Sequence, residues 1–203
     1  MTDTSELAIE TERLGRERQL RVLELCAEGD AVLRERCRRL SREEIRSKEI
    51  QGLIDNMKYT CDEKKYGVGL SANQVGEAVA ISVIAIKPTP SRPNLEVFDQ
   101  VCINTEIVET FGEPELMWEG CVSTAMDKNG EPAMAQVPRF AKVRAKYLDR
   151  DGEEHDEIAE GFVAQVLQHE TDHLNGVLFT DLIGEGELVS NKEYRRIIME
   201  EKK

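Results

Sequence analysis

Long apolar runs are missing from this 203-residue sequence. The longest run, residues 78–86, is interrupted by Ser82, and a membrane-spanning helix needs roughly 20 apolar residues. The first residues also lack the basic start and apolar core of a secretory signal, and they carry acids that transit peptides avoid. We therefore expect a cytoplasmic protein that does not enter the membrane.

Basic residues are few relative to acids: 27 Lys and Arg stand against 40 Asp and Glu, and the net charge is −13. Such a chain is a poor partner for nucleic-acid phosphates and for anionic membranes. The sequence also lacks paired cysteines: its five cysteines form no CxxC pair and have no regular spacing. We expect reduced thiols rather than a disulfide framework.

What is present is enough apolar material, 40% of the residues, for the core of one domain of this length. Residues 5–50 mix bases with acids, contain no proline and space their leucines at near-helical intervals. This pattern predicts a polar helical arm that is broken near residues 29–30. Its charges are typical of a solvated helix face.

The remaining chain alternates helical and strand-like patterns. Apolar residues at i, i+3 and i+4 spacing predict an amphipathic helix over residues 43–61, and a second helix is expected over residues 158–174. Three β-like segments separated by turn sequences lie at residues 79–86, 101–110 and 142–148. The charged end after Gly186 predicts a short surface helix. The expected class is α+β with antiparallel strands.

The sharpest chemical signal is an HExxH motif on the second predicted helix. His169 and His173 are four residues apart, so both imidazoles lie on one helix face and can bind one cation. Glu170 between them is placed to exchange a proton with metal-activated water without itself binding the metal. Phe162 and Val166 continue the same stripe and predict an apolar wall beside the metal.

A catalytic metal site of this kind takes a third protein ligand and keeps one position open. Glu193 stands at the distance found in zinc peptidases, but its neighbours predict an exposed polar helix. Cys121 follows a glycine in the sequence EGCVS, and a thiolate there would bind a metal directly. The third ligand is therefore either Cys121 or Glu193 on this evidence. A site with His169, His173 and Glu193 would be that of a zinc endopeptidase.

A third segment, GVGLSANQ at residues 67–74, is small and glycine-rich, as backbone must be when it closely faces a ligand. Ala72 takes the place of the third glycine of a dinucleotide fingerprint, and no strand pattern precedes the segment, which argues against a Rossmann fold. Taken in order, GVGLSANQ, EGCVS and QHETDHLNG resemble the three signature motifs of the peptide deformylase family. The resemblance extends over about residues 28–183.

The resemblance implies antiparallel β-sheets around a central metal-binding HExxH helix in a catalytic domain of residues 28–183. The predicted polar helical arm then covers residues 1–27, and a charged tail covers residues 184–203. It also implies a role for each motif residue. The metal ligands would be Cys121, His169 and His173. Glu170 would be the acid/base residue, and Gln74 with the Val122 backbone amide would stabilise the oxyanion.

The activity implied by the resemblance is hydrolysis of the formamide bond of N-formylmethionyl peptides, which releases formate and a free amino terminus. One divalent ion is implied, Fe(II) first, with Zn, Ni or Co able to use the same ligands. The partners implied are the formylated peptide and, as a candidate, the ribosome. The residues expected to contact the substrate are Val68, Gly69, Met117, Gly120, Phe162 and Val166.

Several positions depart from the family pattern. Ser71 stands where the first motif commonly has alanine, Val122 replaces a usual leucine, and Gln165 stands where many relatives carry arginine. The stretch 124–136 is longer than expected and should border the substrate cleft. Two alternatives follow: an amidohydrolase for another N-formyl substrate, and a metal-binding homologue without turnover.

Overall fold

A computed structural model describes residues 20–201 apart from residues 66, 90, 91, 125, 127–129 and 185. Five strands and seven helical segments are present in the described chain. The helical segments are η1 (Ala31–Arg34), α2 (Arg42–Ile45), α3 (Lys48–Lys64), η2 (Ala72–Val75), α4 (Gly161–Leu174), η3 (Phe179–Leu182) and α5 (Asn191–Glu201). The strands are β1 (Gly69–Ser71), β2 (Ile81–Ile86), β3 (Phe98–Gly120), β4 (Met134–Leu148) and β5 (Glu154–Glu160).

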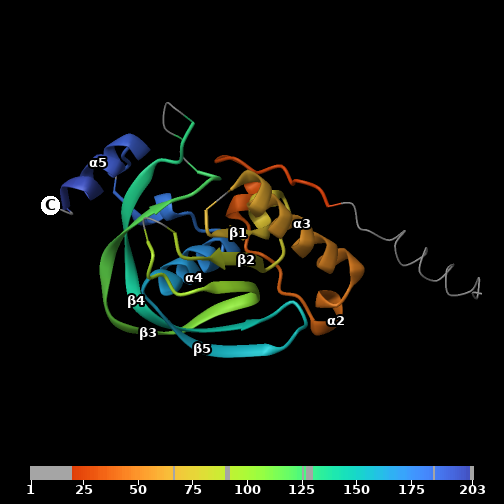
Figure 1. Cartoon of the computed structure of the whole chain (residues 1–203). Coiled ribbons are helices and arrows are strands. Elements are labelled where there is room, and N and C mark those ends of the chain that lie inside the picture. Colours follow the sequence, from red (N-terminus) through yellow and green to blue (C-terminus); the bar gives the residue numbers. More distant parts are fainter. Residues whose placement is uncertain are drawn as a thin grey trace, which may run out of the picture.

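The strands form one antiparallel sheet in the order β1-β2-β3-β4-β5. β3 and β4 are paired along most of their length, and their register shifts at three places between Ile103 and Pro114. Such irregularities bend a sheet, and the β3–β4 pair curves around α4 (Figure 1). The predicted antiparallel α+β fold with a central HExxH helix is confirmed.

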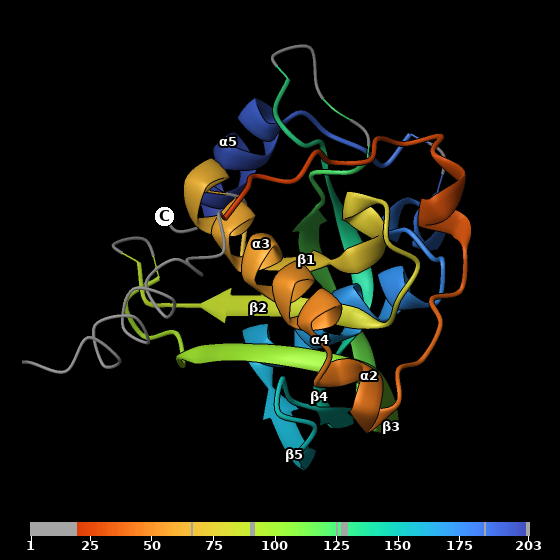
Figure 2. The ribbon, with the colours of Figure 1, turned by 90° about the vertical axis from the view of Figure 1, so that its right-hand side faces the viewer.

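The predicted amphipathic helix over residues 43–61 is confirmed as α3, preceded by the short α2. α3 buries Ile50, Ile54 and Met57, which lie on one face at i, i+4 and i+7. These side chains pack against Ile81 and Val83 of β2 in one core cluster. α3 therefore covers one face of the sheet at β1 and β2 (Figure 2).

The prediction of a helical N-terminal arm is wrong for residues 20–30, the part of the arm that the structure describes. Residues 1–19 lie outside the described residues, and residues 20–30 contain no helix. They run along α3, where Leu23 donates its backbone N–H to the Thr60 hydroxyl, and then reach η2, where the Cys26 N–H donates to the carbonyl of Gln74. Leu23 and Leu25 pack on the α3 core at a period of two, which suits extended chain rather than helix.

The helix predicted over residues 158–174 begins later than expected. β5 occupies Glu154–Glu160, and α4 starts at Gly161. Gly161 has φ of +56°, which a glycine adopts without strain and which turns the strand directly into the helix. The strands of residues 79–86, 101–110 and 142–148 are confirmed, with β3 and β4 much longer than expected.

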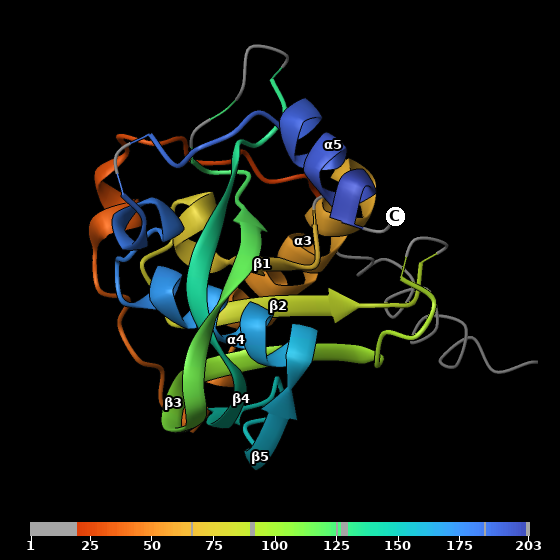
Figure 3. The same ribbon diagram turned by 90° about the vertical axis from the view of Figure 1, so that its left-hand side faces the viewer.

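The short helix expected after Gly186 is confirmed as α5. It lies beside the tip of the β3–β4 pair (Figure 3), where the Tyr194 ring packs on Trp118 with 5.2 Å between centroids. Val189 ahead of it pairs with Met134 at the start of β4 through two backbone hydrogen bonds. Among the described residues, no helix combines the length and apolarity needed to span a bilayer.

Candidate active site

The site is built on α4, which is buried within the curve of the sheet. Its apolar residues Val163, Ala164 and Leu167 belong to the core cluster shared with β2 and β4. Gln168 fixes the helix against β4, because its side-chain oxygen accepts from the Phe140 N–H at 3.0 Å and its nitrogen donates to the Phe140 carbonyl at 2.9 Å. The HExxH residues are thereby held on a rigid support.

The two histidines meet Cys121, which directly follows β3. The Cys121 Sγ lies 3.3 Å from His173 Nε2, and the ligand atoms of Cys121, His169 and His173 all lie within 4.8 Å of one another. One thiolate and two imidazoles converging in this way suit a transition-metal ion with an open position. Burial lowers the pKa of His173, which favours the neutral imidazole that a metal needs.

Glu119, two residues before the cysteine, orients the first histidine. Its Oε2 accepts from His169 Nδ1 at 2.9 Å, so His169 Nε2 is the atom presented to the metal. Arg139 binds both Glu119 oxygens, at 2.9 and 3.1 Å, and also Asp172 Oδ2 at 2.6 Å. Burial alone would raise the pKa of Glu119, but the hydrogen bonds from His169 and Arg139 hold it at about 2.

Glu170 lies on the other side of the histidines, against β1. Its Oε2 accepts a hydrogen bond of 2.6 Å from the Ser71 hydroxyl, and burial raises the pKa of the carboxyl group. Its Oε1 lies so close to Gly69 that a Cβ on that residue would collide with it. Gly69 is therefore required by the close approach of the carboxylate.

The η2 segment supplies two amide side chains. The Ser71 N–H holds Gln74 Oε1 at 2.8 Å, and this turns Gln74 Nε2 toward Cys121 Sγ at 3.3 Å and Ser123 Oγ at 3.2 Å. Asn73 donates to the His173 carbonyl at 2.6 Å. η2 is thus joined both to the end of α4 and to the cysteine segment.

A cavity of about 260 Å³ opens beside these groups. Ten of the residues predicted for the site line it: Val68, Gly69, Gln74, Gly120, Cys121, Val122, Phe162, Val166, His169 and Glu170. His173 is buried behind them with its Nε2 turned to Cys121. Met117 is not among the described residues that line the cavity, and its neighbour Trp118 is.

The match to known proteins is direct. The family model for polypeptide deformylase matches residues 22–188. The chain belongs to the peptide deformylase family. A curated peptide deformylase of Leptospira biflexa is 36% identical over 170 residues, covering 81% of this chain and 89% of the relative. One of Halothermothrix orenii is 40% identical over 162 residues, covering 80% and 94%.

Solved deformylase structures agree. The Met-Ala-Ser-bound class I type b peptide deformylase of Acinetobacter baumannii has 34% identity and a TM-score of 0.72, covering 80% of this chain and 99% of its own. The peptide deformylase of Thermotoga maritima has 32% identity and a TM-score of 0.67, covering 81% and 99%. The Cys/His/His set is the metal site typical of this deformylase family.

The deformylase site excludes the ligand set with Glu193. That residue lies on α5, where its carboxylate binds Arg196 at 2.6 Å, and it is not in the cluster formed by Cys121 and the two histidines. The zinc-endopeptidase interpretation is therefore wrong. The sequence alone does not decide between Cys121 and Glu193 as third ligand, because neither lies close to the HExxH motif in the chain.

Several residues of this deformylase site were missed from the sequence. Trp118, Arg92 and Met134 line the cavity, and the Arg92 guanidinium lies 4.5 Å from the centre of the Phe162 ring. Strand alternation gives a signal for Trp118, because it shares a strand face with Gly120. Arg92 lies in the loop between β2 and β3, and Met134 is the first residue of β4. No local sequence pattern connects either residue with the motifs.

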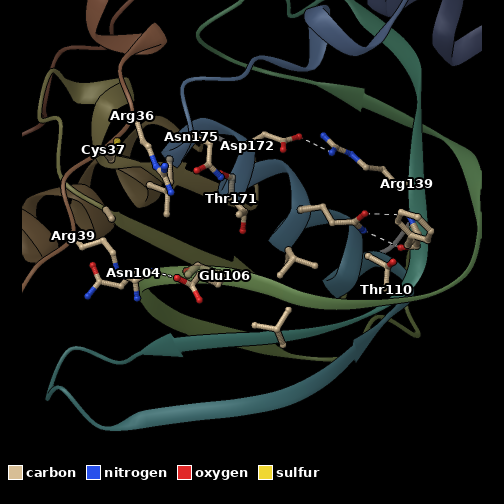
Figure 4. Close-up of a pocket in the computed structure, with 17 residues that line it drawn as sticks. Arg36, Cys37, Arg39, Asn104, Glu106, Thr110, Arg139, Thr171, Asp172 and Asn175 are labelled. Carbon is tan, nitrogen blue, oxygen red and sulfur yellow. Dashed lines mark hydrogen bonds and ion pairs between the residues drawn. The ribbon is translucent and has the colours of Figure 1, made fainter.

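A second and larger cavity, of about 510 Å³, lies on the other side of α4 (Figure 4). Thr171, Asp172 and Asn175 line it from the helix end, and Arg39 and Glu106 form an ion pair on its wall. Asp172 binds Arg139 there, so the charged network behind His169 forms part of both cavities. The metal-binding cluster itself faces the smaller cavity.

Proposed function

We propose that this protein removes the formyl group from N-formylmethionyl peptides, with one metal ion held by Cys121, His169 and His173. The observation that carries the proposal is the convergence of this ligand set with Glu170 and Gln74 around one cavity. Met-Ala-Ser, bound in the Acinetobacter baumannii deformylase, is a methionyl tripeptide of the kind that deformylation leaves.

The donor set suits Fe(II), and we propose it as the native metal. Zn, Ni and Co can use the same thiolate and imidazoles, so metal supply in the cell takes part in the choice. When bound, the ion would polarise the formyl oxygen and lower the pKa of a water molecule. Glu119 would keep His169 in the tautomer that binds it.

Glu170 is the proposed proton carrier. It would accept a proton from the attacking water and deliver it to the nitrogen as the C–N bond breaks, which releases formate and a free amine. The raised pKa produced by its burial suits a group that must both take and give a proton near neutral pH.

Gln74 and the Val122 backbone amide are the proposed donors to the formyl oxygen. Gln74 Nε2 donates to Cys121 Sγ at 3.3 Å and to Ser123 Oγ at 3.2 Å, so a substrate oxygen that gains negative charge would compete well for one of its protons. The Ser71 N–H fixes the other end of this amide and prevents it from flipping.

The methionine side chain of the substrate would lie along Val68, Phe162 and Val166, which give the cavity an apolar wall. Gly120 would let the peptide backbone approach, and a Cβ there would collide with Met134. The substrate is made on the ribosome, so we propose a cytoplasmic protein that meets its substrates there. The net charge of −13 favours brief encounters over stable binding to ribosomal RNA.

A different N-formyl substrate is the second candidate. Met134 and Trp118 line the cavity, and Met134 belongs to the stretch 124–136 that is expected to be longer than in the family. Comparing formyl-Met-Ala-Ser with formyl-Leu and non-peptide formamides separates the two candidates. A higher kcat/KM on the formylmethionyl peptide supports the first.

The test is anaerobic formate release from formyl-Met-Ala-Ser by Fe(II)-loaded protein. Glu170→Gln should keep the metal and lose roughly 10²–10⁴-fold in kcat, the usual contribution of a general acid–base. Cys121→Ser should lose metal and turnover together, and Glu193→Gln should behave as wild type. Metal bound without formate from any substrate would instead indicate a homologue without turnover.

A further inference from the structure

The short strand β1 touches both oxygens of the catalytic carboxylate. Gly69 and Ser71 are its first and last residues and share one face, because side chains alternate along a strand. Gly69 lies against Glu170 Oε1, and the Ser71 hydroxyl donates to Glu170 Oε2 at 2.6 Å.

A second hydroxyl stands behind the first. Ser82 of β2 is the register partner of Ser71, and the two Oγ atoms are 2.8 Å apart. Ser71 donates to Glu170, and a hydroxyl has only one proton, so the Ser71 oxygen accepts from Ser82. All three side chains are buried. The sheet register therefore fixes a directional chain of hydrogen bonds that runs from Ser82 through Ser71 to Glu170.

We propose that Ser71, oriented by Ser82, is a positioning residue that occupies Oε2 of Glu170 and reserves Oε1 for the catalytic proton. This inference rests on the proposed function. Gly69 and Glu170 both line the catalytic cavity, and Oε1 is the oxygen on the Gly69 side. Without the hydroxyl, the carboxylate can turn and divide its time between orientations, and fewer molecules are aligned for proton transfer.

Removing the hydroxyl should slow turnover without weakening substrate binding. We expect Ser71→Ala to lower kcat about tenfold, the effect of losing one hydrogen bond to a charged group, at unchanged KM and metal content. Ser71→Thr keeps a hydroxyl on a residue that suits strands and should stay within about threefold of wild type. Ser82→Ala should lower kcat less than Ser71→Ala, because only the second bond of the chain is lost.

A readout independent of activity is the orientation of Glu170 in crystal structures. The carboxylate should occupy one orientation in the wild type and at least two in Ser71→Ala. Thr60→Val is the matched control, because Thr60 is also a fully buried hydroxyl, and it is bonded to Leu23 and Asn56 rather than to the carboxylate. It should lower the melting temperature and leave kcat unchanged.

The inference is overturned if Ser71→Ala keeps the kcat of the wild type, or if Glu170 keeps one orientation in its crystal structure. If Ser71→Ala does not fold, the kcat of Ser82→Ala is the test instead. A wild-type kcat in Ser82→Ala then overturns the inference. A wild-type protein that releases no formate would reject the proposed function. The Glu170 orientations in the two crystal structures would still decide whether the serine holds the carboxylate.

Discussion

At the scale of single residues, Glu119 links the metal site to the charged network behind it. Both of its oxygens accept hydrogen bonds: Oε1 from Arg139 and Gln165, and Oε2 from Arg139 and His169. Glu119→Gln replaces one carboxylate oxygen with an NH₂ group. That NH₂ group would then face an N–H donor of Arg139 or His169 and could not bond to it. We expect metal affinity to fall about 10–100-fold, the usual cost of losing the partner that orients a ligand.

Competition with a fluorescent chelator, using Zn(II) or Co(II), measures that affinity. Glu106→Gln is the control, since Glu106 is an exposed acid paired with Arg39 away from the metal cluster, and its loss should leave affinity unchanged. Wild-type affinity in Glu119→Gln would show that the histidine is oriented without this carboxylate.

Arg92 is a second residue whose effect can be isolated. Its guanidinium lies over Phe162 at the cavity, and it forms no ion pair with any acid that the structure describes. Arg92→Ala removes a cation–π contact worth about 0.5–1 kcal/mol at an exposed position, together with a donor for peptide carbonyls. We expect a KM for formyl-Met-Ala-Ser raised about three- to tenfold at unchanged kcat.

Steady-state kinetics on the peptide and on its C-terminal amide measure this change. Lys87→Ala, which removes another surface cation, one paired with Asp99, should leave KM unchanged. A change in kcat instead of KM would place Arg92 in the chemical step rather than in binding.

The motif residues could be found in the sequence because their spacing is local, and their partners could not. His169, Glu170 and His173 are fixed by helical geometry alone. Cys121 required the resemblance, since a residue at the end of β3 reaches the helix only through the bend of the sheet. Arg139 and Asp172 form an ion pair although they are 33 positions apart in the chain, and no sequence periodicity predicts a pair at that separation.

At the scale of elements, the direct passage from β5 into α4 depends on one backbone conformation. Gly161 has φ of +56°, and the space where a Cβ would stand is open. Gly161→Ala therefore tests backbone strain without a clash. We expect a loss of about 1–2 kcal/mol in the free energy of unfolding, the cost of the left-handed region for an L-residue.

Urea unfolding followed by circular dichroism measures that loss. Gly52→Ala, inside α3, is the control. It should raise the free energy of unfolding, because alanine is more favourable than glycine in a helix interior by up to about 1 kcal/mol. If Gly161→Ala is as stable as the wild type, the junction adapts and the glycine is not what sets the start of α4.

This junction also explains where element prediction from the sequence stops. The sequence predicts α3 because helical periodicity is local, it predicts α5 from the charged stretch after Gly186, and the apolar run of β2 is equally clear. Residues 158–160 continue the apolar content of α4 yet belong to β5, because pairing with residues 142–144 of β4 gives their backbone a sheet partner. Residues 20–30 are extended for a similar reason, since α3 supplies hydrogen-bond acceptors and a packing surface.

At the scale of the whole molecule, α4 separates two cavities, and the curved β3–β4 pair forms walls of both. The metal cluster lies on one side of the helix and the Arg139–Asp172 pair reaches the other. A metal would join α4 to Cys121, directly after β3, in addition to the hydrogen bond between His169 of α4 and Glu119 of β3. Metal binding should therefore stabilise the whole fold.

Metal removal tests this expectation, because only the folded chain brings Cys121, His169 and His173 within reach of one ion. A ligand at about 100 times its dissociation constant adds about 2.7 kcal/mol to the free energy of unfolding. For a chain of this size 1 kcal/mol corresponds to about 2–4 °C, so calorimetry should show a melting temperature about 5–10 °C higher with metal than with chelator. Glu170→Gln should keep this difference and Cys121→Ser should lose it. A difference that survives Cys121→Ser would mean that the ion is held without the thiolate, and the proposed ligand set would then be wrong.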